Sequence, residues 1–152
     1  MDTDTIKTTL YEATQESIEC LAFAEIEPVE KYIEFETEHL QVTLEIISPE
    51  QGIFTLKASN EFFEYIAHSL MPSEEEISET QIKDLALELL NTIGGNFLNK
   101  ILSDNTTFSL GLPVLKNISS PEKVSEDSLQ CSFMLEEFPF SLYLAGEIIH
   151  SL

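Results

Sequence analysis

The sequence contains few basic residues. Seven lysines and arginines stand against 28 aspartates and glutamates, which gives a formal net charge of −21. Such a surface repels phosphate, so we expect no binding to nucleic acid and no attraction to an anionic membrane. No apolar run approaches the roughly 18 residues of a membrane span, and we expect no membrane insertion. The N-terminus lacks the basic stretch and apolar run of a secretory signal, so a cytoplasmic location is expected.

Residues and motifs that support common enzyme chemistries are also scarce. The two cysteines, Cys20 and Cys131, form no CxxC pair, and we expect small buried thiols rather than a disulfide. The three histidines lie far apart, with no partner at zinc-ligand spacing. GxSxG, HExxH and GxxxxGK[ST] motifs are absent, which removes the usual sequence support for hydrolase, zincin and P-loop chemistry.

An acidic run at residues 74–79 could be mistaken for a metal site. Consecutive residues on a helix point in different directions, so these carboxylates are poorly spaced for chelation. We interpret the run as a solvated segment and expect no metal site in this chain.

The order of the expected elements predicts an α+β fold in a single domain, residues 1–152. With 152 residues and 43 % apolar content, the chain is long enough to bury a core. Strands group with strands, which favours a largely antiparallel sheet with two long helices and a shorter one packed on one face. Helical spacing marks residues 8–24, a segment from Asn60 as N-cap to Leu70, and a long helix opened by Ser78 or Thr80. Alternating patterns mark strands at 40–46, 53–58, 129–137 and 140–144, an interrupted extended piece at 108–116, and a tight turn at 137–139.

The long helix combines an apolar face with an uninterrupted polar row. Its apolar residues recur every three or four positions from Ile82 to Leu102, which indicates one buried face. The polar row consists of Gln81, Asp84, Glu88, Asn91 and Gly95. The three-residue step from Glu88 to Asn91 places these two side chains next to each other on one exposed ridge.

Two adjacent glycines interrupt this helix. Gly94 and Gly95 each cost about 1 kcal/mol relative to alanine in a helix interior. This loss is understandable if a backbone comes close to the helix there. The approaching group is either another element of this protein or a docked partner.

The run ELLNTIGGN resembles the CheX branch of the CheC/CheX/FliY family of chemotaxis phosphatases. Asp84 before it, the later LGLPVL strand and the ESIECLAF helix near the N-terminus extend the likeness. In that family the long helix bears an acidic residue and, three positions on, an asparagine. A small-residue stretch follows that ends in Gly-Asn, here Gly95 and Asn96.

The resemblance implies a CheX/CheC-like fold and a phosphatase that removes the phosphoryl group from the aspartate of a CheY-like response regulator. Asn91 would orient the attacking water, and Glu88 would pair with the active-site lysine of the regulator. Asp84, Gly94 and Gly95 would belong to the docking surface. The magnesium ion would belong to the regulator, so no cofactor is expected in this chain.

The N-terminal helix departs from the two-site pattern of CheC and FliY. It reads ESIE from Glu16 to Glu19, with an acid where the asparagine should be, so one site is expected, as in CheX. The CheX relatives form dimers by joining sheets, and a homodimer through an exposed strand edge at 140–144 is expected. Two alternatives are a non-catalytic module that binds a regulator through the same helix, and a dimeric scaffold with a merely solvated ridge.

Overall fold

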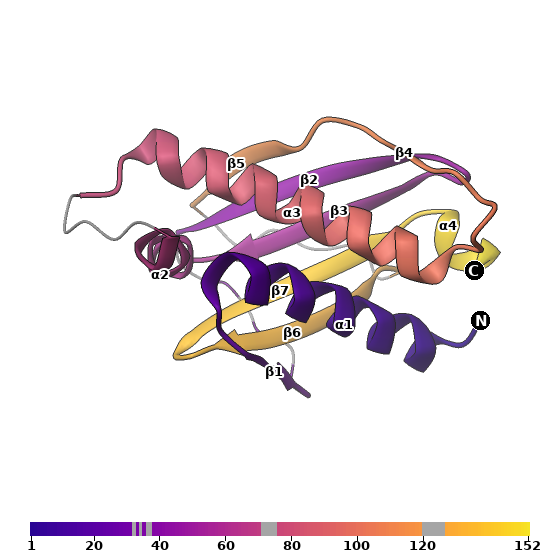
Figure 1. The fold of residues 1–152 in the computed structure, drawn as a ribbon, viewed down its shortest axis with the longest axis horizontal. Coiled ribbons are helices and arrows are strands. Elements are labelled where there is room, and N and C mark those ends of the chain that lie inside the picture. The colour runs from indigo at the N-terminus through magenta and orange to yellow at the C-terminus, as the bar shows by residue number, and fades with distance from the viewer. Residues whose placement is uncertain (32, 34, 36–37, 71–75, 120–126) are drawn as a thin grey trace.

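Helices cover one face of an antiparallel sheet (Figure 1). The computed structural model describes residues 1–31, 33, 35, 38–70, 76–119 and 127–152. The helices are α1 (Thr3–Ala22), α2 (Asn60–Leu70), α3 (Glu79–Ile101) and the short α4 (Ile148–Ser151). The strands are β1 (Ile26–Val29), β2 (His39–Ser48), β3 (Gly52–Ala58), β4 (Ser109–Leu110), β5 (Val114–Ile118), β6 (Leu129–Leu135) and β7 (Phe138–Ala145).

The sheet has the order β1-β6-β7-β3-β2-β4. Strand β5 also pairs with β2, on the same side of it as β4. Every strand pairing in the described sheet is antiparallel. The α+β class with an antiparallel sheet is therefore confirmed.

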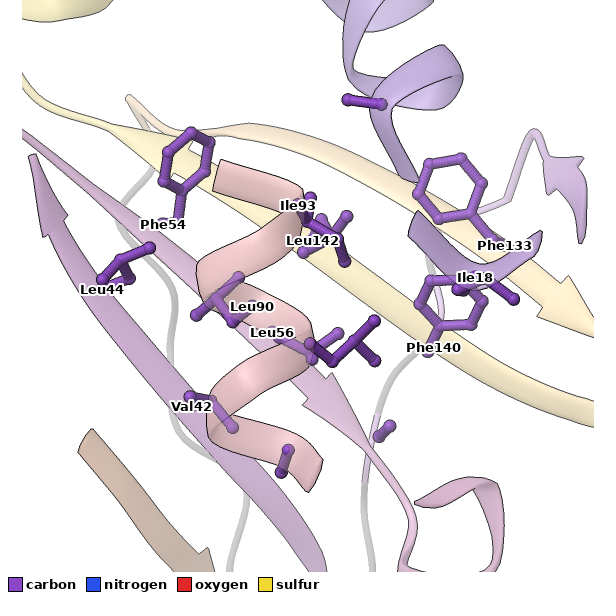
Figure 2. Close-up of a cluster of buried hydrophobic side chains, with 14 of the residues drawn as sticks. Ile18, Val42, Leu44, Phe54, Leu56, Leu90, Ile93, Phe133, Phe140 and Leu142 are labelled. Atoms are coloured by element: carbon purple, nitrogen blue, oxygen red, sulfur yellow. The ribbon is translucent and has the colours of Figure 1, made fainter. Parts of the chain in front are cut away.

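The core lies between the sheet and the two long helices, which run side by side in opposite directions (Figure 1). Figure 2 shows side chains of the sheet meeting Leu90 and Ile93 of α3, with Ile18 of α1 beside Phe133 and Phe140. Each of these five side chains is at most 2 % exposed. Burying a side chain of this size stabilises the fold by about 1.5–3 kcal/mol. Because the apolar side of α3 packs in the core, the opposite, polar side of this helix faces solvent.

The first turn of α3 is fixed by a capping box, which settles the choice between Ser78 and Thr80. The Ser78 Oγ accepts a hydrogen bond from the Gln81 backbone N at 3.2 Å. The Gln81 Oε1 accepts one from the Ser78 backbone N at 2.8 Å. These bonds satisfy two amide groups that have no partner within the helix, so Ser78 is the N-cap.

The other two helix starts differ from the sequence-based prediction. Helix α1 begins at Thr3 rather than residue 8, because the Asp2 side chain accepts a hydrogen bond from the Thr5 N at 2.8 Å. In α2, Asn60 is the first helical residue and not the cap. The preceding Ser59 Oγ accepts from the Phe62 N at 3.3 Å and takes the capping role.

Strand β7 lies in the interior of the sheet, so the expectation that residues 140–144 form a free edge was wrong. It pairs with β3 on one side and with β6 on the other. The turn before it consists of Glu136 and Glu137, and Pro139 already pairs with Met134. Proline is tolerated there because the β3 pairing begins only at Phe140, so no strand on that side needs its missing N–H. The edges of the described sheet are β1 and, on the other side, β4 and β5.

Candidate functional site

The polar row of α3 faces solvent, as its spacing predicts. Asp84, Glu88 and Asn91 are all exposed, and Gly95 is half-buried. Within the described part of the chain, the side chains of Glu88 and Asn91 make no hydrogen bond or ion pair. One turn of helix separates them, so both side chains can contact the surface of one docked partner. We call Asp84, Glu88, Asn91 and Gly95 the ridge.

Polar contacts with α1 hold the second half of α3 in place. The Asn96 Nδ2 donates a hydrogen bond to the Ser17 Oγ at 2.9 Å, and this hydroxyl donates to the Ala13 carbonyl at 2.7 Å. Ser17 is fully buried, so each bond it makes avoids a desolvated, unpaired polar group. This link could not be predicted from the sequence, because Ser17 and Asn96 are 79 residues apart. The only sequence signal is a small polar residue on the apolar side of α1.

A glutamate of the ESIE run on α1 forms an ion pair with a lysine at the end of α3. The Lys100 Nζ lies 2.7 Å from the Glu16 Oε1. The Glu16 hydrogen bond raises the pKa of Lys100. Both side chains are partly solvent-accessible, so the contribution to stability is small. The carboxylate of Glu16 is nevertheless paired, whereas that of Glu88 has no partner among the described residues.

The two adjacent glycines of α3 face different surroundings. A Cβ atom at Gly94 would lie 2.8 Å from the Leu44 Cδ2 and 3.3 Å from the Phe54 Cε2. The close approach at Gly94 is therefore with the sheet of this protein, and Gly94 is buried. This corrects its assignment to the docking surface. At Gly95 a Cβ would meet no atom of the described residues within 4 Å, so nothing in this part of the fold requires a glycine there.

This difference predicts opposite effects of alanine at the two positions. Gly95→Ala should raise the free energy of unfolding by about 1 kcal/mol, because alanine is the better helix former and has room. Gly94→Ala should lower it by about 1–3 kcal/mol through overpacking. Leu44 is fully buried, and Phe54 is held edge-on to Phe97 at 5.5 Å, so neither can move freely. Urea unfolding of both variants measures the difference, and equal stabilisation by both would contradict this packing.

The cysteines differ from each other in burial. Cys20 is exposed on α1, so the expectation of two buried thiols was wrong for this residue. Cys131 on β6 is half-buried, and desolvation raises its pKa to about 11. A thiol with that pKa is almost fully protonated at neutral pH, which makes it a poor nucleophile.

Thiol labelling of the native protein at pH 8 is therefore expected to modify Cys20 rapidly and Cys131 slowly. The raised pKa leaves about one Cys131 in a thousand as thiolate at that pH. Mass spectrometry after timed labelling would show one fast site per chain, with the second labelled at the same rate only in denaturant. Equal rates in the native state would mean that Cys131 is accessible and ionised.

The described residues form neither a metal centre nor a membrane-spanning helix. No group of three or more His, Cys, Asp or Glu side chains in this part of the chain could hold a metal ion. The acidic run at 74–79 lies partly outside the described residues, and its described members Glu76 and Glu79 are exposed. No helix among the described residues has the length and apolar character needed to cross a membrane.

Comparisons with known proteins identify the family. Residues 40–136 match the family model described as chemotaxis phosphatase CheX. The fold is similar to a crystal structure of the chemotaxis protein CheX from Vibrio vulnificus, with a TM-score of 0.76 and 12 % identity over 94 % of this chain and 99 % of that one. A CheX from Desulfovibrio desulfuricans gives 0.75 and 15 %, over 94 % and 99 %. No curated protein matches the sequence.

A structure of the CheX–CheY–BeF3–Mg²⁺ complex from Borrelia burgdorferi is also similar. Its TM-score is 0.66, with 16 % identity over 91 % of this chain and 95 % of the matched one. These likenesses establish a CheX-like fold. Because the family model covers more than half of the sequence, the chain belongs to the CheX family.

Proposed function

We propose that this protein is a phosphatase that hydrolyses the aspartyl phosphate of a CheY-like response regulator in the cytoplasm. The observation that carries the proposal is the exposed Glu88–Asn91 pair on α3, whose side chains have no partner among the described residues. Membership of the CheX family supports the reaction class. The Borrelia burgdorferi complex supports a CheY-like partner.

Asn91 is proposed to orient the attacking water. Phosphoryl transfer depends on placing the nucleophile in line and on stabilising charge, with little covalent work by the protein. A carboxamide both donates and accepts hydrogen bonds, so it can hold a water in one orientation beside the acyl phosphate. Asn91 is exposed on α3, whose opposite face is buried against the protein core. Its side chain can therefore enter the regulator without a rearrangement of α3.

Glu88 is proposed to pair with the active-site lysine of the regulator. A carboxylate and an ammonium group form a charge-assisted hydrogen bond that fixes the register of two surfaces. Glu88 precedes Asn91 by one helical turn, so this pair would set where Asn91 enters. Asp84 extends the same acidic side of the helix, and the open space at Gly95 would permit a close approach of the partner.

The magnesium ion of the reaction is proposed to come with the regulator, so that this chain supplies only Glu88 and Asn91 to the chemistry. A homodimer is proposed to form by edge-to-edge pairing of sheets. Within the described sheet, β1 and the β4–β5 side offer unpaired edges for this.

The test is phosphate release from a phosphorylated CheY-like regulator mixed with a substoichiometric amount of this protein and magnesium. An enzyme releases many phosphates per molecule of protein, whereas a binding module releases no more than the regulator does alone. Binding is followed in parallel with a regulator carrying a stable phosphoryl mimic. Binding without turnover would identify a non-catalytic signalling module, and absence of both would leave a scaffold with a solvated ridge.

A further inference from the structure

A hollow of about 480 Å³ opens where α1 ends and β1 begins, at the opposite end of α1 from the chain terminus. Helix α2 and the β6–β7 turn border it, and Figure 1 shows these elements gathered at one end of the molecule. It is lined by Ala22, Phe23, Ala24, Glu25, Glu27, Tyr65, Met134 and Glu136. None of these residues belongs to the ridge.

A phenylalanine at the rim of this hollow is exposed in a costly backbone conformation. Phe23 is 87 % exposed, and its φ of 53° lies in the left-handed region that favours glycine. Glu136, with φ of 54°, is the other non-glycine residue of the described chain with positive φ. A bulky side chain in this conformation at a helix C-cap, where glycine is usual, lowers stability without an internal packing gain. Both residues with this conformation line the same hollow.

Hydrogen bonds and a ring contact within the protein hold the walls of the hollow in place. The Gln15 Nε2 donates to the Ala24 carbonyl at 3.3 Å, and its Oε1 accepts from the Ile26 backbone N at 2.8 Å. These two bonds fix the segment that follows Phe23. On the other wall, the Tyr65 ring packs against Phe138 with centroids 5.5 Å apart. A ligand group entering here would therefore meet a preformed surface.

The hollow is negatively charged. Three carboxylates, those of Glu25, Glu27 and Glu136, line it, and no lysine or arginine among the described residues does. The ion pair found among the described residues joins Lys100 to Glu16 and involves none of the three. Aromatic and thioether surface beside unneutralised carboxylates is complementary to a cation with a flat, partly apolar face.

We propose that this hollow docks an arginine side chain presented by a protein partner. The guanidinium group stacks on the Phe23 and Tyr65 rings while the carboxylates accept its N–H donors. Arginine fits better than lysine, since the compact ammonium group cannot stack and form a bidentate pair at once. The proposal does not depend on the phosphatase activity, because the hollow and the ridge share no residue.

The test is an NMR titration of the full chain with the peptide acetyl-Gly-Arg-Gly-amide. The amide signals of Phe23, Glu25 and Glu136 are expected to shift and saturate, with a dissociation constant in the millimolar range. The citrulline peptide, which is neutral but has nearly the same shape, should bind about tenfold more weakly. The lysine peptide should fall between the two.

The Phe23→Gly variant separates docking from folding. Glycine suits the left-handed C-cap, so the melting temperature should be unchanged or raised, while binding of the arginine peptide falls about tenfold. Leu112→Ser is the matched control, because Leu112 is 89 % exposed and lies outside the hollow. Equal binding of the arginine and citrulline peptides, or undiminished binding by Phe23→Gly, would overturn the proposal. Concentration-dependent shifts of the same amides without peptide would assign the hollow to a second copy of this chain and would likewise overturn it.

Discussion

Replacing Asn91 by alanine is expected to lower the rate of catalysed phosphate release about 100-fold or more. The methyl group of alanine cannot hold a water, so the nucleophile loses its in-line position although the regulator still docks. Asn91 is exposed and its side chain has no hydrogen bond to any described residue, so the free energy of unfolding should change little. The measurement is the decay of the phosphorylated regulator at saturating concentrations of each protein.

The matched control for this variant is Asn99→Ala on the same helix. Asn99 is also exposed, and it follows Asn91 by about two turns, toward the end of α3. It should retain the wild-type rate. A comparable loss in both variants would point to a general effect on α3, and full activity of Asn91→Ala would remove this residue from the chemistry.

Glu88→Lys is expected to have the second large effect, on binding of the regulator. An ammonium group would face the lysine of the partner, so an attraction becomes a repulsion, and the affinity should fall by about 2 kcal/mol or more, roughly thirtyfold. Asn91 is unchanged in this variant, so a complex that forms at high protein concentration should still release phosphate. The loss should therefore be larger in the apparent KM than in the maximal rate.

Net charge must be separated from this local effect, because the chain carries a formal charge of −21. Glu12→Lys on α1 changes the charge by the same amount at an exposed residue outside the ridge. It should change the affinity only slightly, and raised salt should remove that change. If Glu12→Lys and Glu88→Lys weaken binding equally, long-range charge and not a specific pair controls docking.

The periodicity of the sequence was sufficient to predict the class of fold and the ridge. The row from Ile82 to Leu98 is buried because the helix must place its apolar side on the sheet, and this leaves Asp84, Glu88 and Asn91 exposed. Alternation likewise placed Leu40, Val42, Leu44 and Ile46 on the buried side of β2. In both cases the local pattern and the buried surface agree.

What the sequence could not supply depends on contacts between distant segments. Gly94 and Gly95 are identical neighbours in the chain, yet one packs on Leu44 and Phe54 while the other faces open space. The interior position of β7 follows from its pairing with β3, some 90 residues earlier, which no local pattern encodes. The hollow at Phe23 likewise combines residues from both ends of the sequence.

The ridge on α3 is the surface that we propose binds the phosphorylated regulator, and NMR mapping tests this most directly. Amide signals of this protein are followed while a CheY-like regulator with a stable phosphoryl mimic and magnesium is added. The largest changes are expected from Asp84 to Gly95 on α3, and they should be lost in Glu88→Lys. Changes confined to the sheet edges or to other helices, with α3 unaffected, would contradict it.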